Sequence, residues 1–259
     1  MRSVAGDKVL QAADPSPVRI INPAGASSFL LLGDHAGNAV PHKLEALGLP
    51  PEELARHIGW DIGIGGLGPM LARALDAPFV RQTYSRLVID CNRATDAADA
   101  IPPVSDGTAV PGNADLPPDD RAARIAEIHA PYQATIAELL AARDSVGLQT
   151  VLVSLHSFTP VMRGQARPWD VGVLYDGGDT RFAAAVMAAL RGRGDLVVGD
   201  NEPYRMDLID YTIPRHAYPA RPYVELEIRQ DLIASEAGQR RWTRIVQAVC
   251  REALAAIGN

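Results

Sequence analysis

The sequence predicts a three-layer α/β fold, in which a mostly parallel or mixed central sheet is covered by helices on both faces. Short apolar runs alternate along the chain with segments of helical periodicity, the pattern of such a fold. The chain has 259 residues, 47% of them hydrophobic and 22% charged, which suffices for one large α/β domain. Because no repeat or shift in composition marks a second domain, we expect one domain over residues 1–259, with residues 1–18 as a loose leader.

Six apolar runs predict the strands of the sheet, since runs of four to eight such residues are typical of buried strands. In the last run, apolar residues alternate with Glu225 and Glu227, so both carboxylates face one side of that strand. The predicted strands lie within residues 27–38 (where a glycine-rich turn follows), 85–93, 150–155, 170–175, 195–199 and 222–229.

Helical spacing of apolar residues predicts helices at 67–75, 125–139, 181–190 and 237–256, with a kink or break at Pro131. Residues 94–120 are rich in proline, glycine and aspartate. Loops of this length are usually functional or mobile, so we expect this one to cover a site.

Composition excludes several classes of protein. The net charge of −6 and the absence of a basic run argue against a nucleic-acid partner. No apolar run approaches the roughly 20 residues that a membrane span needs. The two cysteines, Cys91 and Cys250, are too few for a disulfide framework, so we expect a cytoplasmic protein.

Polar side chains follow three of the predicted strands where each strand ends. Ligands of open α/β sheets bind at the carboxyl ends of the strands, so this repetition indicates a polar site. The residues are Asp34 and His35, then Asp90, Asn92 and Arg93, and finally His156 and Ser157.

His35 and His156 are either satisfied strand-end histidines or metal ligands. Nearby carboxylates favour a metal, because catalytic zinc takes three protein ligands from His, Asp and Glu and keeps one position for water. Imidazole also suits iron, copper and nickel, so zinc is the expected ion without being the only fit. Asp61 begins a predicted helix and is either its N-cap or a further ligand.

The remaining candidates each have two interpretations. A carboxylate at Glu225 or Glu227 is a general base, one partner of a salt bridge to Arg229 or another arginine, or part of an exposed sheet face. Arg86 and the pair Asn92–Arg93 either clamp an anionic substrate or form an ordinary surface pair with Asp96 or Asp99.

Seven stretches, occurring in order between Leu31 and Leu232, resemble the N-formylglutamate amidohydrolase family. The resemblance implies a metal-dependent enzyme that cleaves N-formyl-L-glutamate, a small-molecule substrate, with one Zn²⁺ as cofactor. A carboxypeptidase-like deacylase acting on another acyl amino acid or a peptidoglycan fragment, and a metal-free binding module, are the alternatives. The stretches are LLGDHAGNAVP, HIGWDIG, YSRLVIDCNR, VSLHSFTP, DNEPY, DYTIPRHA and VELEIRQDL.

That family is similar in fold to the zinc carboxypeptidases, a phosphorylase/hydrolase-like fold, and the similarity implies roles for single residues. His35 and His156 match metal-ligand segments, and Glu227 matches the catalytic base, with Glu225 as the reserve. The segment that includes Asn92 and Arg93 matches one that holds substrate.

The chain departs from the carboxypeptidase pattern at Asn38, which stands where a glutamate ligand is expected. We expect Asp61 as the third ligand, because HIGWDIG is one of the stretches that resemble the family and its carboxylate begins a helix near the site. Asp34, Asn38 and His57 are the alternatives. Further substrate contacts are expected from Asn38, Arg86, Arg163 and Arg205.

Overall fold

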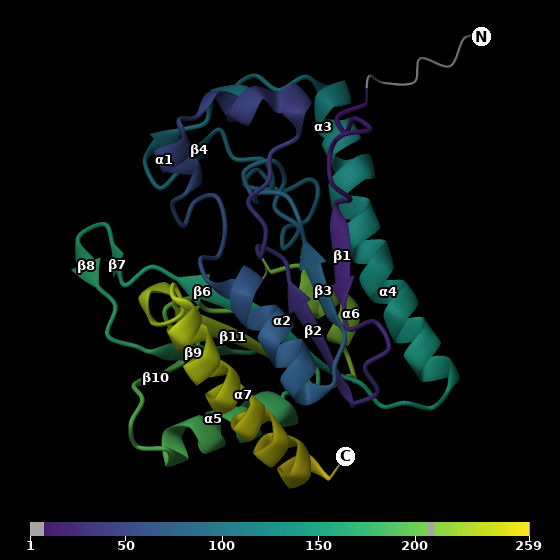
Figure 1. Cartoon of the computed structure of the whole chain (residues 1–259), viewed down its shortest axis with the longest axis vertical. Coiled ribbons are helices and arrows are strands. Elements are labelled where there is room, and N and C mark those ends of the chain that lie inside the picture. The colour runs from purple at the N-terminus through teal and green to yellow at the C-terminus, as the bar shows by residue number, and fades with distance from the viewer. Residues whose placement is uncertain (1–7, 207–209, 259) are drawn as a thin grey trace.

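The protein, described here by a computed structural model over residues 8–206 and 210–258, has the predicted mixed sheet between two layers of helices (Figure 1). Within those residues the sheet consists, in spatial order, of β1 (Val18–Ile21), β3 (Phe79–Gln82), β2 (Phe29–Gly33), β6 (Val151–Phe158), β11 (Tyr223–Arg229), β9 (Val171–Leu174) and β10 (Val198–Asp200). The central strands β3, β2, β6 and β11 run parallel, whereas β1, β9 and β10 run in the opposite direction.

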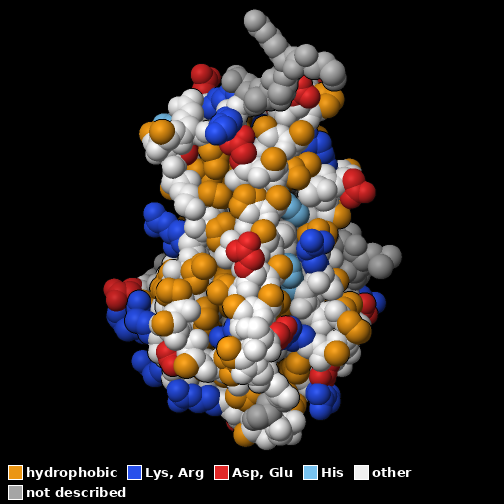
Figure 2. Space-filling model, turned by 90° about the vertical axis from the view of Figure 1, so that its right-hand side faces the viewer, with side chains coloured by type: hydrophobic (Ala, Val, Ile, Leu, Met, Phe, Trp, Pro, Cys, Tyr) orange, Lys and Arg blue, Asp and Glu red, His pale blue; other side chains and the backbone are white. Residues whose placement is uncertain are grey.

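Among the described residues, one face of the sheet is covered by α2 (Ile64–Leu75), α5 (Arg181–Gly192) and α7 (Glu236–Ile257). The other face carries α4 (Ala130–Ser145) and α6 (Thr212–Ala217), and α3 (Pro118–Arg124) precedes α4. The short helix α1 (Pro51–Leu54) lies in a connection. Figure 2 shows the side that carries α4, where acidic and basic side chains are interspersed. No helix of the described residues is long and apolar enough to cross a membrane.

Strand alternation sends Ser154 and His156 of β6 and both glutamates of β11 to one face. Val153 and Val224 pack in the core under α2, α5 and α7, whereas Leu152 and Tyr223 pack in the core on the side of α4 and α6. Since successive side chains point to opposite faces, His156, Glu225 and Glu227 all lie on the face of α4 and α6. This confirms that the two glutamates share one face.

The prediction of a strand at residues 85–93 is wrong. The strand is β3, and residues 85–93 form a buried connection that turns at Ser85, where the Val88 N–H donates to the Ser85 carbonyl at 2.9 Å. Leu87, Val88 and Ile89 are each buried, although they do not alternate between two faces. The continuous apolar run therefore reflects burial on every side here. Periodicity alone cannot distinguish a buried strand from a buried segment of another conformation.

A kink or break was predicted at Pro131. The structure has a π-helical turn (Ile125–His129) between α3 and α4, and Pro131 lies in the first turn of α4. Residues 94–120 contain a small hairpin of β4 (Val104–Ser105) and β5 (Thr108–Ala109). This loop is held to the body by the buried Arg124, which donates to the carbonyl of Gly112 at 3.0 Å and to the Asn113 side chain at 2.6 Å. A second small hairpin pairs β7 (Val161–Met162) with β8 (Gln165–Ala166).

The leader predicted at residues 1–18 lies partly outside the described residues. From residue 8 onward the chain is packed, since Val9 is buried and its N–H donates to the Glu127 carboxylate at 3.0 Å. The Tyr84 hydroxyl donates to the Pro15 carbonyl at 2.6 Å.

Candidate active site

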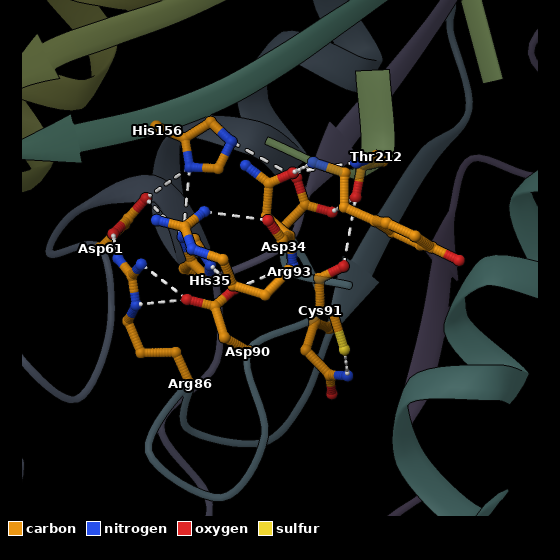
Figure 3. Close-up of polar contacts among 12 residues, drawn as sticks. Asp34, His35, Asp61, Arg86, Asp90, Cys91, Arg93, His156 and Thr212 are labelled. Carbon is orange, nitrogen blue, oxygen red and sulfur yellow. Dashed lines mark hydrogen bonds and ion pairs between the residues drawn. The ribbon is translucent and has the colours of Figure 1, made fainter. Parts of the chain in front are cut away.

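Three side chains predicted as metal ligands converge at the carboxyl edge of the sheet. His35 follows β2, His156 lies near the end of β6, and Asp61 precedes α2 (Figure 3). The Nδ1 atom of His156 is 3.2 Å from His35 Nδ1 and 2.9 Å from Asp61 Oδ2, and His35 Nδ1 is 3.5 Å from the same oxygen. All three residues are buried.

These separations fit a bound metal ion. A tetrahedral zinc ion with bonds of about 2.0 Å separates its ligand atoms by about 3.3 Å, close to the sides of this triangle. Two imidazole Nδ1 atoms and one carboxylate oxygen are also the donor types that zinc prefers. A cation at their centre would remove the repulsion between two nitrogen lone pairs that face each other.

Buried carboxylates hold the outer nitrogen of each histidine. His35 Nε2 lies 2.7 Å from Asp90 Oδ1, and His156 Nε2 lies 3.3 Å from Asp34 Oδ2. Each carboxylate favours a proton on Nε2 and so leaves the Nδ1 lone pair for the centre, as partners of metal-binding histidines usually do. This pairing on both rings is a second observation in favour of a metal.

Asp61 is oriented by the main chain and does not cap α2. Its N–H donates to the His35 carbonyl at 2.9 Å, and its carboxylate accepts the Ser157 N–H at 3.2 Å. The N-cap of α2 is Gly63, whose φ of 92° lies in the left-handed region that favours glycine. Burial alone would raise the pKa of Asp61, but the adjacent His35 and His156 outweigh it and hold that pKa well below its usual range.

The other candidates for third ligand lie elsewhere. Asp34 is on the outer side of His156, and His57 Nε2 is 3.4 Å from Asp106. The Asn38 amide donates to the Leu54 carbonyl at 2.7 Å, and Asn38 lines neither of the two cavities at the site. Only Asp61 therefore brings a carboxylate to the two Nδ1 atoms among these four residues.

Glu225 and Glu227 project from β11 beside the histidines. In the parallel pairing of β6 with β11, Glu227 is opposite His156 and Glu225 is opposite Ser154. Both glutamates are buried, and Oε2 of each has no hydrogen-bond partner. Burial, as the largest cause, raises the pKa of Glu227 to about 8 and raises that of Glu225 well above its usual value. Neither carboxylate forms the predicted alternative salt bridge with Arg229, which pairs with Asp170 and Asp231.

Two of the four predicted arginines are held by aspartates. Arg86 donates from Nε and Nη2 to Asp90 Oδ2 at 3.1 and 2.7 Å. Arg93 donates from Nε to Asp99 at 2.8 Å, the pairing that was the alternative to substrate binding. Arg93 nevertheless lines both cavities, and the side chain of its partner Asp99 is 55% exposed.

Asn92 lines the first cavity and also holds the start of α6. Its side-chain oxygen accepts the N–H groups of Tyr211 and Thr212 at 3.1 and 2.9 Å, and its amide donates to Asp210 at 3.1 Å. These bonds engage both ends of the amide, so the side chain fixes the start of α6.

The site opens into a cavity of about 170 Å³, and a second cavity of about 300 Å³ adjoins it. The two share His57, Arg86, Arg93 and Tyr204 as walls. Arg205 lines the first and Arg163 the second, so the structure places these two predicted arginines at different ends of one cleft.

Sequence reasoning gave no role to three residues that the structure places at the site. Asp90 orients His35, Thr212 bonds to Asp34 at 2.9 Å, and Tyr204 lines both cavities. Asp90 stands in the segment that resembles the substrate-holding one. Tyr204 and Thr212 lie in the stretches DNEPY and DYTIPRHA, whose resemblance to the family was the available signal.

The family model of N-formylglutamate amidohydrolase matches residues 27–234, a span that contains every residue of the candidate metal triad and both glutamates. The chain belongs to the N-formylglutamate amidohydrolase family. This confirms the predicted family and supports a hydrolase of the N-formylglutamate amidohydrolase type.

Two solved structures share the fold of the chain. A gene product of Agrobacterium tumefaciens is 34% identical, with 97% of this chain and all of that chain covered and a TM-score of 0.93. An N-formylglutamate amidohydrolase from Ralstonia eutropha shares the fold at 22% identity, with 92% of this chain and 97% of that one covered and a TM-score of 0.66. No curated protein matches the chain.

Proposed function

We propose that the chain is a single-domain, metal-dependent amidohydrolase that cleaves N-formyl-L-glutamate to glutamate and formate, or cleaves a closely related N-acyl amino acid in the same way. The proposal rests chiefly on three potential ligand atoms, which lie 2.9–3.5 Å apart: Nδ1 of His35, Nδ1 of His156 and Oδ2 of Asp61. Membership of the family supplies the substrate class. His35, Asp61 and His156 hold the metal, and zinc fits their donor set best.

When bound, the metal polarises the amide carbonyl and lowers the pKa of water at the site. Glu227 accepts a proton from the attacking water while the water oxygen forms a bond to the carbonyl carbon. The C–N bond then breaks as Glu227 returns that proton to the leaving nitrogen. A carboxyl with a pKa of about 8 keeps its proton at pH 7, and a nearby dication favours the ionised form that this role needs.

The substrate carboxylates are held by arginines on the cleft walls. Arg93 binds the α-carboxylate, since a planar guanidinium matches a planar carboxylate. Arg205 and Arg163 are the candidates for the second carboxylate, and Arg86 is engaged by Asp90. The adjoining 300 Å³ cavity favours, as a second candidate function, hydrolysis of an acyl amino acid larger than N-formylglutamate.

A metal-loaded assay over a panel of N-acyl amino acids tests the proposal. We expect Zn²⁺-dependent release of glutamate from N-formyl-L-glutamate. Stoichiometric zinc with activity only on larger acyl amino acids would support the second candidate. Purified protein that binds no divalent metal and turns over no member of the panel would be a binding module, contrary to our proposal.

A further inference from the structure

We propose that Thr212 is a positioning residue of the metal centre, which holds His156 in its ligand orientation by way of Asp34. The inference rests on the proposed function, because it concerns how the metal ligands are supported. Thr212 opens α6, is buried, and donates from Oγ1 to Asp34 Oδ1 at 2.9 Å (Figure 3).

The direction of each bond in this chain is set by the chemistry of its groups. His216 Nε2 lies 2.7 Å from Gln133 Oε1, and an amide oxygen only accepts, so His216 is the donor. Gln133 Nε2 then donates to the Cys91 carbonyl at 2.8 Å and to Thr212 Oγ1 at 3.1 Å. The hydroxyl of Thr212 accepts this proton and has two acceptors for its own, Asp34 Oδ1 at 2.9 Å and the Cys91 carbonyl at 3.3 Å. The closer, charged carboxylate is the stronger acceptor, so the proton is directed to Asp34.

Asp34 passes this constraint on to His156. Its Oδ2 lies 3.3 Å from His156 Nε2 and accepts the Ser154 hydroxyl at 3.4 Å, and that hydroxyl is itself 3.0 Å from His156 Nε2. With Oδ1 fixed by Thr212, the carboxylate cannot turn without losing a buried hydrogen bond. The Nδ1 atom of His156 is thereby kept toward His35 and Asp61.

The same end of α6 is tied to the other histidine. Asn92 accepts the Thr212 N–H at 2.9 Å with its side chain, and its own N–H donates to Asp90 Oδ1 at 2.8 Å. That oxygen is the one 2.7 Å from His35 Nε2. The first residue of α6 therefore lies behind both carboxylates that orient the histidines.

Thr212→Val tests the hydroxyl, because valine keeps the branched shape and removes the hydrogen bonds. Groups bonded directly to a metal ligand, as Asp34 is to His156, typically contribute about 10- to 100-fold in metal affinity. Thr212 lies one bond further out, so we expect Zn²⁺ to bind about 10-fold more weakly, at the lower end of that range. Thr212→Ser should restore affinity to within a few-fold of wild type. The matched control is Thr243→Val. The Thr243 hydroxyl donates to the Gln239 carbonyl at 2.7 Å within α7, outside the site, so this variant should bind Zn²⁺ as wild type does.

The readout is Zn²⁺ affinity by competition with a chelating dye, with the absorption spectrum of the Co²⁺-loaded protein as a report of ligand geometry. Thr212→Ala provides a second test that does not depend on how valine packs. In an Asp34→Asn background, Thr212→Val should add little further loss, because both changes act on one path.

Wild-type affinity in both Thr212→Val and Thr212→Ala, or losses that add in the double variant, would overturn the role of Thr212. A wild-type protein that binds no Zn²⁺ would instead overturn the proposed function itself. The two failures are thus distinguished by the wild-type measurement alone.

Discussion

His156 and Glu227 occupy paired positions on the parallel strands β6 and β11, so a candidate metal ligand and a buried carboxyl are presented side by side. The pairing is fixed by the main-chain ladder, and one residue of slippage would turn either side chain to the opposite face. The sheet itself therefore sets the spacing between the candidate metal and the candidate base.

The first prediction concerns the base. Glu227→Gln keeps the size of the side chain but cannot accept a proton, so turnover should fall about 10²- to 10⁴-fold. Zinc content should remain at the wild-type value, since Glu227 is outside the ligand triangle. The comparison variant is Glu225→Gln, which is equally buried on the same face. If it shows the large loss while Glu227→Gln does not, the base is one alternation away from our assignment.

The second prediction concerns the ligands. His156→Ala removes one corner of the triangle, so the purified protein should lose its zinc while its circular dichroism spectrum stays close to that of wild type. His42→Ala is the control, because His42 has a side chain that is 68% exposed and pairs with Asp14 outside the site. Metal analysis of the two purified variants decides the matter, and full occupancy in His156→Ala would contradict the proposed centre.

The third prediction concerns the substrate carboxylate. Loss of one charged hydrogen bond, worth about 1.5–3 kcal/mol, should lower kcat/KM for N-formylglutamate roughly 10- to 100-fold in Arg93→Ala. Arg93→Lys should not restore it, since lysine lacks the planar fork. The control is Asp99→Asn, which breaks the 2.8 Å ion pair but keeps the guanidinium, and should change kcat/KM little.

The α-amide of N-formylglutamate completes this test on the substrate side. Wild-type protein should hydrolyse the amide more slowly than the acid, and Arg93→Ala should treat the two alike. Equal rates in wild type, or an Asp99→Asn variant as impaired as Arg93→Ala, would mean that Arg93 serves the ion pair and no carboxylate clamp exists.

The parts of the site that local pattern encodes were predictable from the sequence. Strand alternation gave the shared face of Glu225 and Glu227, and the positions after apolar strands gave His35 and His156. What could not be predicted depends on contacts between distant segments. Thr212 bonds to Asp34 across 178 positions of the chain, and no periodicity reports such a pair.

Three further predictions show the same limit. Residues 85–93 are apolar because they are buried on all sides, which a strand pattern mimics. Asn92 was expected to contact substrate, and it lines the first cavity, but its side-chain amide also fixes the start of α6. Asn38 was expected at the substrate, yet it packs against the Leu54 carbonyl. In each case the residue type indicated burial or hydrogen bonding, but the sequence did not show which groups the residue contacts.

The last prediction concerns stability and pH through His216, which donates to Gln133 in the support of α6. Burial, followed by the charge of Arg215, lowers the pKa of His216 to about 4. Between about pH 4 and the ordinary histidine pKa of about 6.5, the unfolded chain therefore binds a proton that the folded protein does not. The contribution that the uncharged His216 makes to the free energy of unfolding is therefore fully present above about pH 6.5, and it is lost as the pH falls toward 4.

A shift of this size corresponds to at most about 3 kcal/mol of unfolding free energy. His216→Gln keeps a donor for Gln133 but does not titrate. Urea unfolding of both proteins at pH 7.0, 6.0, 5.0 and 4.5 gives the difference in unfolding free energy, in which the other titrating groups largely cancel. We expect that difference to shift in favour of the variant as the pH falls. A difference that stays constant from pH 7.0 to 4.5 would show that the folded protein accommodates a charged His216.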